Sequence, residues 1–101
     1  MTEPGALGPA TVLVAARDQV SAQVEGEAVI LNLADSVYYG LDGVGARVWE
    51  LLREPRSVAE LRDAITAEYA VDGETALRDL LVLLDELSAR GLVQPAAREG
   101  E

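Results

Sequence analysis

The spacing of apolar residues changes once along the chain, at Leu41, and this change limits the possible folds more than any other feature. Before it, Val20–Val24 alternates apolar and polar residues, and the β-branched run Ala28–Leu33 follows after the turn Glu25–Glu27. Val37–Leu41 is another segment of high strand propensity. The first half of the chain is therefore predicted to form a three-stranded antiparallel meander.

Beyond this point, apolar residues recur every three or four positions, which predicts three helices. Asp42 is expected to cap the first helix, which runs to Arg53. Ser57–Glu60 matches a capping box and opens the second helix, and the third runs from Asp72 to a glycine cap at Gly91. Three strands followed by three helices indicate an α+β, winged-helix-like fold.

The folded domain is expected to span residues 18–94. Residues 1–17, which begin MTEPGALGPA, are predicted to be a flexible N-terminal segment in which Thr11–Val14 can form a short strand. Residues 95–101 are predicted to be a flexible tail. Leu92–Pro95 is interpreted either as a short final strand or as an extended segment packed on the domain.

The chain has 101 residues with no cysteine and no histidine, which removes most catalytic chemistry. Disulfide scaffolds, thiolate zinc sites, cysteine nucleophiles and histidine general bases are excluded. Ser36 and Ser57 are interpreted as turn and cap residues, because no histidine could activate them. Asp42-Gly43 and Asp72-Gly73 lack the remaining ligands of a calcium loop and are interpreted as caps. The sequence predicts no enzyme activity, no cofactor and no metal site.

The charge balance is strongly acidic, with 18 Asp and Glu against 8 Arg and a net charge of −10. Such a chain repels phosphate backbones, so nucleic acid is not an expected partner. The N-terminus lacks a basic region followed by a long apolar stretch, so no signal peptide or membrane anchor is expected and the cytoplasm is the expected location.

Aromatic and apolar residues indicate which surfaces are buried. Trp49 is expected to anchor the core. Tyr38 and Tyr39 are consecutive in a strand, so one should enter the core while the other stays outside. The third helix is expected to bury the stripe Leu77, Leu80, Leu84 and Leu87. Val82 falls on the far face, where it is either part of a partner surface or a lone exposed valine.

Five elements, in order, carry a family resemblance: Val29–Leu33, Tyr38–Asp42, Gly45–Trp49, Ser57–Leu61 and Leu80–Leu92. Together they resemble the PqqD-like family, the winged-helix leader-peptide recognition elements of ribosomal peptide biosynthesis, over residues 18–94. A chain of this length is most similar to the stand-alone members that serve lasso-peptide pathways. Asp42 replaces the commoner Asn, and residues 53–56 replace a Gly-containing loop, but neither change touches the expected binding edge.

The resemblance implies a non-catalytic protein that binds the leader of a precursor peptide and presents it to a processing enzyme, such as a leader peptidase. The leader would pair with the open edge of the third strand and lie in the groove against the third helix. A terminal strand without a later partner independently favours such strand addition. The implied peptide-binding residues are Ser36, Val37, Tyr38, Tyr39 and Gly40 on the strand edge, with Arg78, Leu81, Val82, Asp85 and Glu86 on the helix.

Three other functions remain open from the sequence. The first is a peptide chaperone for a radical-SAM enzyme, as in the quinone-cofactor pathway. The second is a winged-helix transcription regulator, which rests on fold analogy alone and is opposed by the acidic third helix. The third is a small interaction subunit without peptide specificity.

Overall fold

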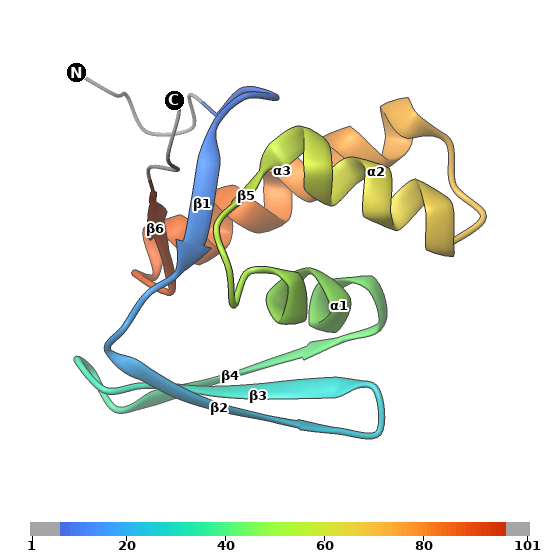
Figure 1. Ribbon diagram of the computed structural model, residues 1–101. Helices are drawn as coiled ribbons and strands as arrows, with labels where there is room; N and C mark the ends of the chain where they lie inside the picture. The colour runs from blue at the N-terminus through green and yellow to red at the C-terminus, as the bar shows by residue number, and fades with distance from the viewer. Residues whose placement is uncertain (1–6, 97–101) are drawn as a thin grey trace.

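A computed structural model describes residues 7–96 (Figure 1), and the outer parts of both predicted tails lie outside the described residues. Strands β2 (Gln19–Val24), β3 (Glu27–Asn32) and β4 (Val37–Asp42) form an antiparallel sheet in that order. Glu25 and Gly26, between β2 and β3, have positive φ values of 50° and 82°, as a type I′ hairpin turn requires. The predicted meander is confirmed.

The three predicted helices are also confirmed, as α1 (Gly43–Leu51), α2 (Val58–Glu68) and α3 (Gly73–Ala89). Ser57 and Glu60 form the expected capping box at the start of α2. Asp42 occupies the N-cap position of α1 without making a side-chain capping bond, and the chain turns into the helix through Gly43, whose φ is 53°.

A second, small sheet joins distant parts of the chain in the order β5 (Arg56–Ser57), β1 (Val12–Ala15) and β6 (Val93–Pro95). The fold therefore extends beyond both expected boundaries of residues 18–94. Leu13 of β1 is 1 % exposed and belongs to the core, although it lies in the segment expected to be flexible. β1 is ordered by partners far along the chain, because Leu13 pairs with Arg56 and with Pro95.

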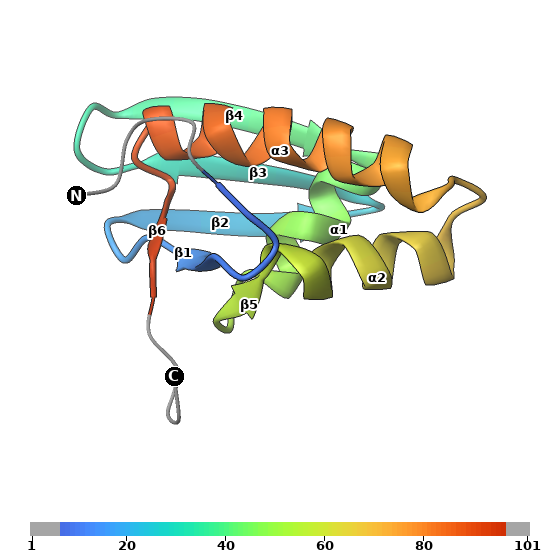
Figure 2. The same ribbon diagram turned by 90° about the horizontal axis from the view of Figure 1, so that it is seen from above.

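The meander forms one layer and the helices cover its inner face (Figures 1 and 2). α1 packs on β3 and β4, and α2 packs on α3. Ala28 and Ile30 project from β3 into the core, where Trp49 is buried as expected. Of the predicted stripe on α3, Leu80, Leu84 and Leu87 are buried, whereas Leu77 is only partly buried. None of the helices within residues 7–96 has the length and apolar character needed to cross a bilayer.

Candidate functional site

β4 is a free edge of the meander. It pairs with β3 on one side, and no described strand pairs with it on the other. Gly40, in the middle of β4, has open space where a side chain would stand. An edge strand of this kind exposes a row of backbone N–H and C=O groups, which an extended peptide can satisfy by adding a strand.

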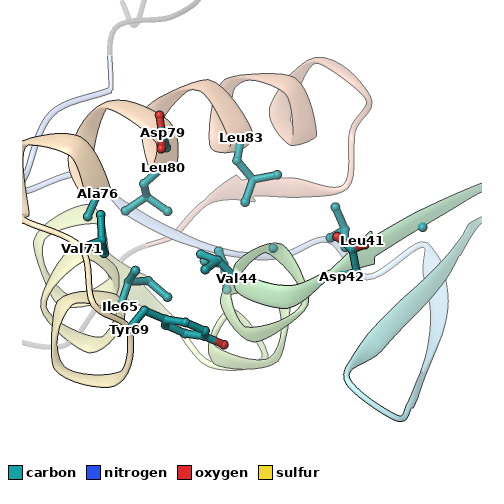
Figure 3. Close-up of a pocket in the computed structure, with 13 residues that line it drawn as sticks. Leu41, Asp42, Val44, Ile65, Tyr69, Val71, Ala76, Asp79, Leu80 and Leu83 are labelled. Atoms are coloured by element: carbon teal, nitrogen blue, oxygen red, sulfur yellow. The ribbon is translucent and has the colours of Figure 1, made fainter.

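An apolar cavity of about 420 Å³ lies beside the C-terminal half of this edge. Four elements or their connections contribute its lining: Gly40, Leu41 and Asp42 from β4; Val44, Gly45 and Val48 from α1; Ile65, Tyr69 and Val71 from the end of α2 and the following loop; and Ala76, Asp79, Leu80 and Leu83 from α3. Figure 3 shows Leu80 and Leu83 pointing from α3 toward the cavity, with Ile65 and Tyr69 on the α2 side. The cavity can therefore receive an apolar side chain from a peptide placed along β4.

α3 approaches β4 at two places, because both elements line the cavity and the end of α3 reaches Tyr39. At the C-terminal end of α3, the Arg90 guanidinium lies 4.7 Å from the centre of the Tyr39 ring, a cation–π contact. The same arginine forms an ion pair of 3.5 Å with Glu86. Contact with Tyr39, and to a lesser extent with Glu86, raises the pKa of Arg90, so this group is a fixed positive charge at the end of the groove.

Helix geometry identifies the α3 residues that share this face. Asp79, Leu83, Glu86 and Arg90 are spaced by four, three and four positions, so they form one row along α3. Asp79 and Leu83 line the cavity and Arg90 contacts Tyr39, which shows that the row faces β4. Asn32 fixes this arrangement, because its Nδ2 donates a 3.0 Å hydrogen bond to the Arg90 carbonyl oxygen and ties the end of β3 to the end of α3.

The residues expected on the strand edge lie where the sequence placed them. Ser36 occupies the β3–β4 turn with a φ of 60°, and Val37 begins β4. Tyr38 is 68 % exposed on the outer face, whereas Tyr39 packs against the core and Arg90. The predicted separation of the two tyrosines is confirmed.

The residues expected on the helix wall divide into two groups. Val82 is 65 % exposed and adjoins the row that faces β4, of which Glu86 is a member. Arg78 and Asp85 lie about 40° and 60° from Val82 around the helix axis, on the exposed side of α3, and they stay predicted groove residues with it. Leu81 lies about 160° from Leu83, on the opposite flank, and is partly buried against the core. The structure therefore does not bring Leu81 to the row that faces β4.

The sequence interpretation did not identify Asp79, Leu83 and Arg90 as groove residues. Leu83 lies within the run Leu80–Leu84, where every helical face carries an apolar residue, so periodicity shows the buried stripe but not the flank that meets β4. The signal that could have identified this row is its spacing of four, three and four positions, from Asp79 through Leu83 and Glu86 to Arg90.

Within residues 7–96, no group of three or more acidic side chains is close enough to hold a metal ion. The Ser57 hydroxyl accepts from the Glu60 backbone N–H in the capping box, at 3.1 Å. The site thus consists of a backbone edge, an apolar cavity and charged residues on its rim.

Comparison with known proteins places this architecture in a family. The family described as "Coenzyme PQQ synthesis protein D (PqqD)" matches residues 27–93. The structure of TbiB1 in complex with the TbiA(beta) leader peptide is 41% identical in sequence, with a TM-score of 0.77, over 84% of this chain and 99% of that one. No curated protein matches the chain in sequence.

Two further structures share the fold. Lasso peptide synthetase B1 complexed with the leader peptide is 25% identical, with a TM-score of 0.72, over 82% of this chain and 98% of that one. The PqqD truncation of PqqCD from Methylobacterium extorquens, described as a stand-alone RiPP recognition element, is 21% identical, with a TM-score of 0.74, over 92% of this chain and 99% of that one, and shows the fold alone. The match over residues 27–93 and the 41% identity to TbiB1 establish that this chain belongs to the PqqD family.

Proposed function

We propose that the chain is a non-catalytic recognition protein that binds the leader of a ribosomally made precursor peptide. The leader adds as a strand to β4 and lies in the groove between β4 and α3. The observation that carries this proposal is the free β4 edge beside an apolar cavity to which α3 contributes a wall. The two leader-peptide complexes among similar structures support it.

The groove indicates the character of the leader. Backbone pairing with residues 36–40 supplies affinity that does not depend on sequence, and the cavity selects an apolar side chain at one position. Asp42 and Asp79 lie at the cavity end and Arg90 at the other, so the two ends differ in charge. A leader with a basic residue near its cavity-bound side chain fits this distribution.

We further propose that the protein acts in the cytoplasm, beside ribosomal synthesis, and presents the bound leader to a leader peptidase of the lasso type. Similarity to a lasso peptide synthetase B1 favours this assignment over a radical-SAM partner. The absence of cysteine and histidine from the chain supports a role in binding, with the chemistry supplied by the partner.

Titration of the protein with a synthetic leader from the precursor encoded beside it tests the proposal. A saturable 1:1 curve is expected, and no binding at tens of micromolar protein would refute leader recognition. Hydrogen exchange then locates the strand: the amides of β4 should become protected, while those of β2, the other edge of the same sheet, should not. Protection of β2 instead of β4 would refute the proposed edge.

Val82→Glu tests the helix wall. A carboxylate placed at the apolar rim of the groove should weaken leader binding by about 1–3 kcal/mol, roughly ten- to hundredfold. The fold should be retained because Val82 is exposed. Ala67→Glu, at an exposed position of α2 outside the cavity lining, is the matched control for the added charge, and it should bind like the wild type. Equal affinity of folded Val82→Glu and wild type would place the peptide elsewhere.

A further inference from the structure

A second pocket, of about 580 Å³, lies at the opposite end of β4 from the apolar cavity. The β1–β2 connection contributes Arg17 and Asp18 to its lining, the β3–β4 turn contributes Asp35, and the end of α3 contributes Arg90. Figure 1 shows the β1–β2 connection and the β3–β4 turn at the same end of the sheet. Because Arg90 also contacts Tyr39 of β4, the groove continues into this second pocket, which we call the polar pocket.

Arg17 extends from a fixed stretch of backbone. The Ala16 N–H donates to the Leu92 carbonyl oxygen at 2.8 Å, and the Asp18 carbonyl oxygen accepts from the Leu33 N–H at 3.0 Å. The residues on both sides of Arg17 are therefore tied to other parts of the fold, and the β1–β2 connection does not move as a free loop would. A side chain presented from fixed backbone loses less conformational entropy when it binds a ligand.

The charged groups of the polar pocket differ in how far they are already engaged. Arg17 is exposed, and it forms no ion pair with a carboxylate of residues 7–96. The Asp35 carboxylate, in contrast, accepts from the Val37 N–H at 3.0 Å. An incoming carboxylate meets two guanidinium groups, those of Arg17 and Arg90, whereas an incoming cation meets mainly Asp18. Since a planar guanidinium can hold a carboxylate through two hydrogen bonds, the polar pocket favours an acidic ligand.

We propose that the polar pocket is a second subsite for the leader, and that it takes an acidic side chain whose carboxylate binds Arg17, with Arg90 as a second donor. The inference rests on the proposed function, because it takes the leader to lie along β4. Roughly 15–20 Å of extended chain separates Leu41 beside the cavity from Asp35 at the polar pocket. The acidic residue should therefore stand about four to six positions from the cavity-bound apolar residue of the leader. Two subsites at this separation select the register of the leader strand, which backbone pairing alone leaves weakly specified.

The test is a charge scan of the synthetic leader, in which each position in turn carries Glu, Gln or Lys and affinity is measured by fluorescence anisotropy. At one position, about four to six residues from the apolar residue whose replacement by alanine weakens binding most, Glu should bind the wild type about three- to tenfold more tightly than Gln. Arg17→Gln should abolish this preference and leave the affinity for the Gln peptide unchanged, which also shows that the variant folds. Arg17→Glu should reverse the preference in favour of Lys.

Arg62→Gln is the matched control, because it removes an arginine from α2, outside the lining of both pockets, and it should keep the preference for Glu. If Arg17→Gln does not fold, Arg17→Lys replaces it and should reduce the preference, since lysine lacks the planar fork.

The outcomes separate this inference from the proposed function. A preference for Glu that persists undiminished in the Arg17 variants, a preference for Lys in the wild type, or equal binding of Glu, Gln and Lys at every position would overturn the inference. Normal binding of the unaltered leader would then leave the proposed function standing. If the wild type binds no leader peptide at all, the proposed function fails, and the second subsite fails with it.

Discussion

Trp49 is a residue whose role is to stabilise the core. It is 1 % exposed, the largest of the fully buried side chains, and part of the central cluster. Trp49→Ala should leave a cavity and destabilise the domain by about 3–5 kcal/mol, a large part of the stability of a domain of this size. Urea unfolding followed by far-UV circular dichroism measures this loss. Val82→Ala, at an exposed position, should change stability by less than about 0.5 kcal/mol, and a similar loss for both variants would contradict the core assignment of Trp49.

Asn32 is a second kind of residue, polar and buried at 6 % exposure. Its Oδ1 accepts from the Ala34 backbone N–H at 2.9 Å, while its Nδ2 donates to the Arg90 carbonyl oxygen. Both ends of the amide are satisfied, so the burial of this polar group is stable. The sequence alone could not predict the hydrogen bond from Asn32 to the Arg90 carbonyl oxygen, because it joins residues 58 positions apart. Asn32 thus positions the row of α3 that borders the groove without itself belonging to the groove.

At the scale of elements, turns and helix ends that depend on neighbouring residues were predicted from the sequence. The β2–β3 hairpin follows from Glu25 and Gly26, and the start of α2 follows from the Ser57–Glu60 capping box. In the sheet β5-β1-β6, strands at Thr11–Val14 and Leu92–Pro95 were among the expectations, and the structure has β1 and β6 there. Their pairing was not predicted, because the ladders contain only two or three pairs between distant segments. Local propensity does not report such tertiary pairing or the burial of Leu13.

The rotation of α3 explains the partial prediction of the groove. An alternating strand has two faces, so Tyr38 and Tyr39 could be assigned to opposite sides without a structure. A helix has two flanks beside its buried stripe, and nothing local distinguishes the flank that meets β4 from the other. Leu81 was therefore assigned to the wall with Val82 and Glu86, although it lies on the flank away from the row that faces β4.

The N-terminus of α3 provides a pH-dependent prediction. The Asp72 carboxylate accepts from the Thr75 backbone N–H at 2.8 Å and from the Thr75 hydroxyl at 3.1 Å. These bonds lower the pKa of Asp72 below its ordinary value of 3.8. Because the pKa is depressed in the folded state, the stabilisation is complete above pH 3.8 and is lost as the pH falls through the lower folded-state value.

Asp72→Asn isolates this effect, since asparagine also caps a helix but does not titrate. The difference in urea midpoint between the wild type and Asp72→Asn should be constant near neutral pH. It should move against the wild type as the pH falls below 3.8. Parallel midpoints down to the lowest pH at which both proteins fold would show that the Thr75 bonds do not act on the charged carboxylate.

At the scale of the whole molecule, the groove lies on a chain with a net charge of −10. This charge accelerates the approach of basic partners and slows that of acidic ones. The electrostatic field of the whole chain therefore favours a cationic leader.

The negative charge of the chain also distinguishes it from DNA-binding domains of similar fold. A winged-helix regulator would present a basic recognition helix, but the arginines of α3 are paired within the helix: Arg78 lies 3.9 Å from Asp79, and Arg90 lies 3.5 Å from Glu86. With phosphates repelled by the whole chain, random duplex DNA should not be retained in a mobility-shift assay even at low salt, where backbone contacts are strongest. A basic winged-helix domain run on the same gel is the positive control. Retention of the duplex by this chain at micromolar concentration, decreasing as salt rises, would favour the regulator over leader recognition.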